Sequence, residues 1–362
     1  MRSLVEIDLV AVAANTRRLC ELAGEAEVWA VVKADAYGHG AVEVGRAAAA
    51  AGAARLCVAT LDEAGTLRAA LPDVPLIVLS PLAPGEEQLI AAIGCAVTVA
   101  TAEGWTALRE RPEIDVHIKV DTGMGRWGLA PDEAVAIGNE IASGPRPERL
   151  AGLMSHLATA DDDPAGFVDQ QLAVFRAVAA RFPPCPRHLA NSAALLRRPD
   201  LLFDAVRPGI ALYGVDPMGS TATDHGLAPV MRWVSSVRSL RTLPPGASTG
   251  YGRRFVADQE CRVALVPVGY ADGYPRVLSG AADVLIRGVR CRVVANVSMD
   301  QLAVLVPDGL TVVGGDEVVL LGSSGDEHVT AEELAQLAGV IPWEILCGVR
   351  SASDRGVRLA RG

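Results

Sequence analysis

The chain has 362 residues, of which 50% are hydrophobic, and this is enough apolar material for two folded domains and excludes a disordered chain. Its formal net charge is −10, and its arginines are scattered, so we expect neither nucleic-acid nor membrane binding. The sequence lacks a secretory signal pattern and a long apolar segment, which predicts a cytoplasmic protein with a small-molecule ligand. Seven cysteines without a C-x-x-C pair favour reduced thiols and no metal site.

Eight short apolar runs alternate with Ala/Leu/Arg-rich helical stretches over the first 215 residues or so of the chain. The runs are VWAVVK (28–33), RLCVAT (55–60), PLIVLS (75–80), AVTVAT (96–101), DVHIKV (115–120), LAGLMSH (150–156), PRHLANS (186–192) and VRPGIALYG (206–214). Nearly continuous hydrophobicity is typical of parallel strands buried on both faces, and each gap has room for a helix. The pattern predicts an α/β fold with a closed (β/α)8 TIM-type barrel.

From about residue 227 the alternation of strands and helices ends, and the sequence predicts strands separated by Pro-Gly, Ser-Gly and Gly-Gly turns. We therefore predict a barrel domain over residues 1–226 and a mainly-β domain over 227–362, with DPMGSTATDHG (216–226) as the linker. Three helix starts are predicted: after Asp8 as a cap, at Pro131, and at Thr330, which is spaced from Glu333 as in a capping box.

Polar residues follow the predicted barrel strands, at the ends where reactive groups of such barrels are found. The first strand ends at Lys33, with Tyr37 and His39 in the next loop. The others supply Lys119, Asp121 and Arg126 from the fifth strand and its loop, Ser155 and His156 from the sixth, Asn191 and Ser192 from the seventh, and Arg207 at the opening of the eighth. We expect these side chains to share one face of the barrel.

Lysine is rare in this chain: only Lys33 and Lys119 are lysines among its 33 basic residues. The loops after the last two strands, with Ser192 and Gly209, are placed as in barrel phosphate sites. A lysine amine beside a phosphate site can form a Schiff base with an aldehyde cofactor, which a guanidinium does not do. The alternatives are a lysine that reaches out to water, a helix-capping Ser192 and a turn at Gly209.

Several long motifs resemble those of one known family. They are VVKADAYGHG (31–40), KVDTGMGR (119–126), SHLATAD (155–161), NSAA (191–194), RPGIALYG (207–214), GYG (250–252), GYADGYPR (269–276) and VSMDQ (297–301). On these motifs the chain resembles the alanine racemase family of fold-type III enzymes, which use pyridoxal 5'-phosphate (PLP). The resemblance covers nearly the whole chain, and it implies a homodimer with shared active sites.

The resemblance also implies roles for single residues. Lys33 holds PLP and serves as one catalytic base, and Tyr251 of the neighbouring subunit serves as the other. Arg207 faces the pyridine nitrogen with His156 behind it, and Arg126 binds the substrate carboxylate. The remaining implied contacts are Tyr37, Asn191, Ser192, Gly209 and Ile210 for the cofactor, and Tyr270, Met299 and Asp300 for the substrate. Lys119 is implied to be carbamylated so that it positions Arg126; an unmodified lysine in a salt bridge is the alternative.

The C-terminal segment departs from the family pattern. Trp343 replaces a tyrosine, and Ser351 stands where a second tyrosine is usual. A serine there would enlarge the substrate pocket, so a serine or broad-specificity racemase is an alternative to an enzyme that acts on alanine. A PLP-binding protein without turnover and a decarboxylase of the same fold type are further alternatives, and the motifs of the predicted β domain argue against both.

Overall fold

The computed structural model describes residues 2–83, 85–163, 165–219, 221–350 and 357–362. The chain forms two compact units. The barrel unit comprises Ala11–Ala36 and Gly40–Ala228, and the β unit comprises Met1–Val10, Tyr37–His39 and Pro229–Gly362. In the described chain, no helix is both long and apolar enough to cross a membrane.

The barrel unit contains, among its described residues, a closed barrel of eight parallel strands. The strands are β2 (Glu27–Val31), β3 (Arg55–Val58), β4 (Leu76–Val78), β5 (Ala96–Val99), β6 (Val116–Lys119), β7 (Leu150–Met154), β8 (Arg187–His188) and β9 (Ala205–Val206). Strands such as β4 and β5 are buried along their whole length, which explains their continuous apolar sequence. The predicted fold class is confirmed.

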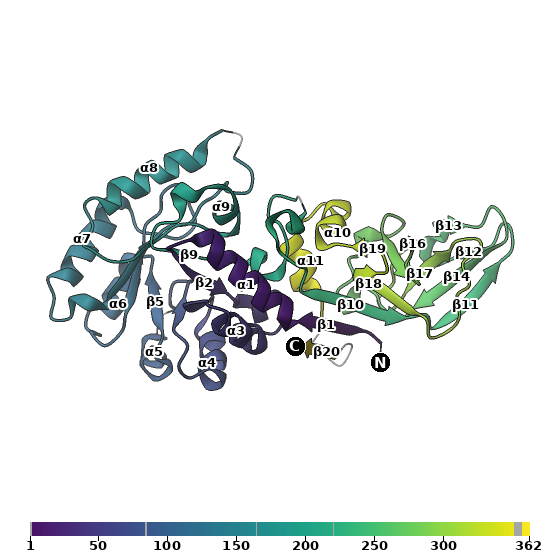
Figure 1. Ribbon diagram of the computed structural model, residues 1–362, viewed down its shortest axis with the longest axis horizontal. Helices are drawn as coiled ribbons and strands as arrows, with labels where there is room; N and C mark the ends of the chain where they lie inside the picture. The colour runs from purple at the N-terminus through teal and green to yellow at the C-terminus, as the bar shows by residue number, and fades with distance from the viewer. Residues whose placement is uncertain (1, 84, 164, 220, 351–356) are drawn as a thin grey trace. The chain divides into compact units, whose positions relative to one another are not determined.

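Helices lie on the outside of the barrel strands, as α3, α7 and α8 show in Figure 1. They are α1 (Leu9–Ala23), α3 (Ala41–Ala50), α4 (Leu61–Ala70), α5 (Glu87–Ile93), α6 (Ala102–Leu108), α7 (Pro131–Ala142), α8 (Phe167–Ala179) and α9 (Ser192–Arg197). The short segment α2 (Lys33–Tyr37) follows β2 and is not a regular helix, because its inner residues have positive φ. Helix α7 begins at Pro131 with acidic residues in its first turn, as predicted. Helix α4 has a full capping box between Thr60 and Glu63.

The β unit is built on one mixed sheet with ten described strands in the order β11-β14-β17-β16-β15-β18-β10-β1-β20, with β19 paired to β18. The strands are β1 (Leu4–Asp8), β10 (Met231–Ser236), β11 (Ser239–Leu243), β14 (Cys261–Val266), β15 (Asp283–Ile286), β16 (Val289–Val294), β17 (Leu302–Val306), β18 (Glu317–Ser324), β19 (Glu327–Val329) and β20 (Val357–Arg361). A separate hairpin joins β12 (Ser248–Thr249) to β13 (Phe255–Val256).

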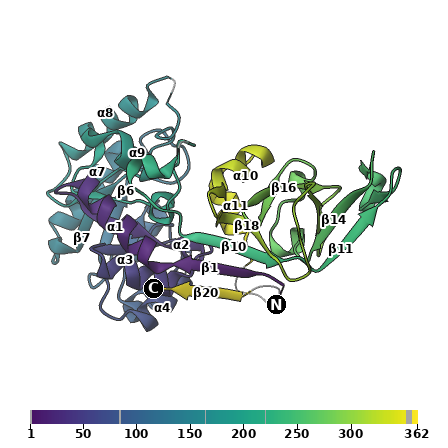
Figure 2. The ribbon, with the colours of Figure 1, turned by 45° about the vertical axis from the view of Figure 1, so that its right-hand side comes forward.

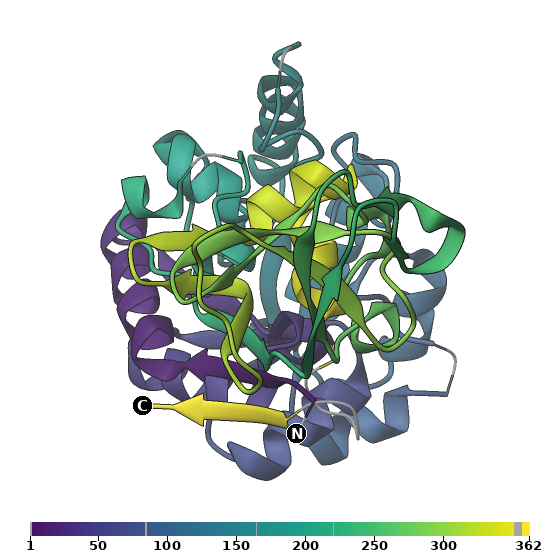
Figure 3. The ribbon, with the colours of Figure 1, turned by 90° about the vertical axis from the view of Figure 1, so that its right-hand side faces the viewer.

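The first residues of the chain differ from expectation. Strand β1 pairs antiparallel with β10 and parallel with β20, so it belongs to the sheet of the β unit (Figure 2). Figure 3 shows β20 beside β1 at the edge of that sheet. The alternating burial of β1, with Val5 and Ile7 fully buried, explains the pairing. The run LVEID is short and leads directly into a helix, so this strand was not predicted from the sequence.

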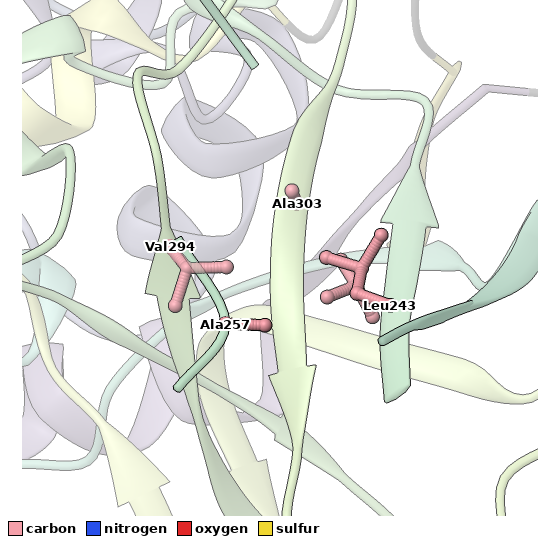
Figure 4. Packing of buried hydrophobic residues seen from close by; sticks show 5 residues of the cluster. Leu243, Ala257, Val294 and Ala303 are labelled. Carbon is pink, nitrogen blue, oxygen red and sulfur yellow. The ribbon is translucent and has the colours of Figure 1, made fainter. Parts of the chain in front are cut away.

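The β unit also contains the α-helices α10 (Ala331–Ala338) and α11 (Pro342–Gly348). The Thr330 hydroxyl caps α10 by accepting from the Glu333 amide, as predicted, whereas the Glu333 carboxylate accepts hydrogen bonds from Arg290. A small apolar cluster packs between the strands near the hairpin (Figure 4). Its buried members are Leu243, Ala257, Val263, Val294 and Ala303.

Candidate active site

Cationic side chains meet at the C-terminal ends of the barrel strands. Lys119, at the end of β6, is 6% exposed, and burial together with the charges of Arg207, Arg126 and Lys33 lowers its pKa to about 8. Burial and the same cations, with Lys119, hold the pKa of His156 well below its ordinary value. Five predicted site residues from four different strand ends are therefore electrostatic neighbours, in a protein whose net charge is negative.

Lys33 begins a rare left-handed turn. The next four residues, 34–37, have φ between 52° and 54°, although none of them is glycine. Such a conformation costs about 1–2 kcal/mol for each L-residue, so the surrounding structure must hold it. Asp35 supplies part of this support, because its carbonyl accepts from the Gly40 amide at 2.8 Å and its carboxylate from the Ala41 amide at 2.8 Å.

Glu63 anchors the start of the same turn. One carboxylate oxygen accepts from the Ala34 amide at 2.7 Å, and the other accepts from the Ala59 amide at 2.7 Å. Glu63 lies in the first turn of α4, where the hydroxyl of Thr60 accepts a hydrogen bond from the backbone amide of Glu63. The capping box of α4 therefore also fixes the backbone directly after Lys33.

Arg207 lies directly after β9, at its C-terminal end, and the prediction that it opens the strand is wrong. Pro208 follows it, and the strand stops at Val206. The guanidinium is buried and donates through Nη2 to the carbonyl of Ser155 at 2.7 Å, with His156 Nδ1 3.4 Å away. Burial lowers the pKa of Arg207 only to about 10, so it remains a cation at neutral pH.

Two buried histidines extend the Arg207 contact into the barrel interior. Arg207 Nη1 lies 2.8 Å from His188 Nδ1, and His188 Nε2 lies 3.0 Å from His117 Nδ1. Gly152 packs against the His117 ring, where a Cβ atom would come within 2.5 Å of Nδ1. Neither histidine was among the predicted site residues, although a histidine inside each of two barrel strands is a usable signal because such positions are normally apolar.

The loops after β8 and β9 are joined through one hydroxyl. Ser192 Oγ accepts from the amides of Gly209 at 2.9 Å and Ala211 at 3.3 Å, and it is 5% exposed. Asn191 caps α9 by accepting from the Ala194 amide at 3.1 Å. The predicted phosphate residues thus come together, and the Ser192 proton stays available for an acceptor because both of these bonds use its oxygen.

In the β unit, the GYADGYPR and VSMDQ segments lie side by side. The Tyr270 amide donates to the Ser298 carbonyl at 3.1 Å, and the Ala271 amide donates to the Met299 carbonyl at 3.0 Å. Gly269 is required there, because a Cβ atom would lie 2.2 Å from the Ser298 oxygen. Arg2, which was not among the predicted site residues, ties the pair by donating to the Asp300 carbonyl at 2.7 Å and to the Asp272 carboxylate at 3.2 Å.

Tyr251 lies in the loop between β12 and β13 and is 75% exposed. Its carbonyl accepts from the Asn296 side chain at 2.9 Å, so the backbone of the loop is tied although the phenol projects outward. Tyr270 and Met299 of the same unit are 41% and 52% exposed. The β unit therefore presents predicted site residues on its surface.

The loop after Lys33 divides between the units. Residues 37–39, including Tyr37, group with the β unit, where Gly38 packs so closely on α11 that a Cβ atom would lie 2.9 Å from the Leu346 carbonyl oxygen.

Ser351 lies outside the described residues. Among the residues that the structure describes, no group of three or more His, Cys, Asp or Glu side chains could hold a metal ion.

Comparison with known proteins places this geometry in one family. A family model described as alanine racemase, N-terminal domain, matches residues 7–217, and one described as alanine racemase, C-terminal domain, matches residues 230–357. The chain belongs to the alanine racemase family. The alanine racemase of Symbiobacterium thermophilum is 44% identical over 354 residues, which cover 95% of this chain and 94% of that protein.

Solved alanine racemases also share the fold. The crystal structure of the enzyme from Streptomyces lavendulae superposes with a TM-score of 0.93 at 36% identity, covering 100% of this chain and 97% of that one. The alanine racemase of Bartonella henselae, whose crystal structure has covalently bound pyridoxal phosphate, has a TM-score of 0.88 at 32% identity, with 100% of both chains covered. The recognised family is thereby confirmed from sequence and from structure.

Proposed function

We propose that the protein is a PLP-dependent alanine racemase that interconverts L- and D-alanine. The observation that carries the proposal is the cluster of Lys33, Lys119, Arg126 and Arg207 at the barrel strand ends of a chain that belongs to the alanine racemase family. A cluster of cations at the C-terminal ends of the barrel strands, in a protein with a negative net charge, favours binding of an anionic ligand. PLP supplies a phosphate, and alanine supplies a carboxylate.

The residues present fit PLP. Lys33 provides the amine for covalent attachment, and the donor proton of Ser192 together with the adjacent Gly209–Ile210 backbone suits a phosphate. Asn191 and Tyr37 complete the proposed cofactor contacts. When bound, PLP withdraws electrons from the substrate and makes its Cα proton removable.

Arg207 is the proposed partner of the pyridine nitrogen. A guanidinium only donates hydrogen bonds and keeps its charge, so the nitrogen that it faces stays unprotonated. The carbonyl of Ser155 and the Nδ1 atom of His188 hold the guanidinium plane in place, and His156 lies beside it as a neutral ring.

Inversion at Cα requires proton transfer on two opposite faces. We assign one face to the Lys33 amine and the other to the Tyr251 phenol of a second copy of the chain, in a homodimer with shared sites. The exposure of Tyr251 supports this assignment, because a phenol that is 75% exposed on a tied loop is available to a partner. Met299, Tyr270 and Asp300 are proposed to meet the substrate from the same side.

Arg126 is the proposed carboxylate ligand, and its position depends on Lys119. We propose that Lys119 is carbamylated, because a lysine with a pKa near 8 is a nucleophile at neutral pH and a carbamate would offset the surrounding positive charge. An enzyme of this kind would supply D-alanine for peptidoglycan precursors in the cytoplasm.

The function is tested by two measurements on one preparation: the visible absorbance of a lysine-bound PLP, and the loss of optical rotation of L-alanine. We expect both signals. A PLP spectrum without racemisation would favour a PLP-binding protein, and release of CO2 would favour a decarboxylase.

A further inference from the structure

Gln171, in the first half of α8, is fully buried and uses its whole side-chain amide. The carbonyl oxygen accepts from the Ala158 amide at 2.8 Å, and the nitrogen donates to the His156 carbonyl at 3.0 Å and to the Thr122 hydroxyl at 3.1 Å. The orientation of the amide is fixed, because a backbone N–H only donates and a carbonyl only accepts.

The hydrogen bonds beyond Thr122 have a single direction. Ser155 Oγ donates to the Val120 carbonyl at 2.8 Å, which uses the only proton of that hydroxyl. The 2.9 Å contact between Thr122 and Ser155 must then be donated by Thr122. Thr122 in turn accepts from Gln171, so the buried chain runs from Gln171 through Thr122 and Ser155 to the end of strand β6.

This chain joins two loops that carry proposed site residues. Thr122 opens the segment that leads to Arg126, and Gly123 of that segment packs on α8, where a Cβ atom would lie 2.8 Å from the Phe167 ring. On the other side, Gln171 holds the His156 carbonyl, and the preceding carbonyl, that of Ser155, accepts from Arg207.

We propose that Gln171 is a positioning residue that sets the Arg126 loop against His156 and thereby tunes binding of the substrate carboxylate. The proposal rests on the assignment of Arg126 as the carboxylate ligand. Gln171 acts through the backbone of the two loops and the Thr122 hydroxyl and touches neither substrate nor cofactor.

The isosteric variant Q171E is the sharpest test. A carboxylate keeps the shape but has no N–H, so it faces the His156 carbonyl without a donor and competes with Ser155 for the Thr122 proton. We expect the KM for L-alanine and the Kd for propionate, a substrate carboxylate without the amine, each to rise about tenfold, while kcat changes less. PLP affinity should stay near that of the unchanged protein.

Two controls separate positioning from simple loss of stability. Q170E makes the same substitution at the preceding residue of α8, which is exposed, and should leave KM and propionate binding unchanged. V168A removes buried volume from the same helix and should lower Tm without raising KM.

The milder variant T122V removes only the middle hydroxyl of the chain and keeps the other two bonds of Gln171, so it should raise both constants by a smaller factor. It serves the test even where Q171E folds poorly. The proposal is overturned if Q171E or T122V lowers Tm as V168A does while KM and propionate binding stay unchanged. If the unchanged protein itself fails to racemise alanine, it is the proposed function that fails.

Discussion

Arg207 and His188 are joined twice: Nη1 of the arginine lies 2.8 Å from Nδ1 of the histidine and 2.8 Å from its carbonyl oxygen. Because a guanidinium only donates, His188 Nδ1 accepts, and the His188 proton sits on Nε2 and is donated to His117 Nδ1. The geometry therefore assigns one neutral tautomer to each ring. Arg207, the proposed partner of the pyridine nitrogen, thus starts a directed chain of donors that ends at His117 inside the barrel.

The neutral state of these histidines predicts acid sensitivity. Burial, with the charges of Arg55 and Arg207, lowers the pKa of His117 to about 3 from 6.5. Between these values the unfolded chain binds a proton that the folded chain does not. The free energy of unfolding should thus fall as pH drops below about 6.5, by up to about 1.4 kcal/mol per pH unit for this residue.

Chemical denaturation at pH 7 and pH 5 measures this effect. H117Q should show a shallower pH dependence than the unchanged protein, whereas H328Q, at an exposed histidine, should show the same one. Equal pH dependence in H117Q and the unchanged protein would contradict the assignment.

Glu63 is predicted to support the backbone beside Lys33, the proposed site of PLP attachment. In E63A the amide of Ala34 loses its acceptor, the left-handed turn relaxes, and PLP affinity should fall about tenfold, as titration of the apoprotein with PLP would measure. T60A removes the other half of the capping box and costs about 1 kcal/mol of stability, but it leaves the Ala34 contact. The idea fails if T60A and E63A weaken PLP binding equally.

Lys119 is predicted to take up CO2. Because its pKa is near 8, the fraction of Lys119 that is unprotonated increases as pH rises through 8. In NMR spectra with 13C-bicarbonate, the carbamate carbon signal should therefore be stronger at pH 9 than at pH 7. K119R should lack the signal because a guanidinium is not nucleophilic. A signal of the same strength in K119R would locate the carbamate elsewhere.

Ser351 predicts a broader substrate range. The sequence predicts that a serine at the position where the family usually has a tyrosine enlarges the substrate pocket, and a pocket discriminates between side chains that differ by one methylene or hydroxyl by only about 1–3 kcal/mol. The ratio of kcat/KM for L-serine to that for L-alanine should fall in S351Y. A strict preference for alanine in the unchanged protein would rule out the enlarged pocket.

The barrel and its strand ends were predictable because parallel strands buried on both faces read as continuous apolar runs, and the polar residues that end them stand out. Strand β1 was not predictable, since its five residues are recognisable as a strand only through their pairing with β10 and β20, which are distant in sequence. The residues that support the candidate site from outside it were not predicted for a similar reason. Glu63 and Gln171 act on backbone groups of distant loops, and no local pattern marks such contacts.

Subunit complementation tests the central claim, that Lys33 and Tyr251 of two copies form one site. K33A and Y251F, each inactive alone, are co-expressed and assayed for racemisation of L-alanine. The account predicts about a quarter of the unchanged activity, because half of the dimers are mixed and each mixed dimer holds one intact site. Folded mixed dimers without any recovered activity would contradict it.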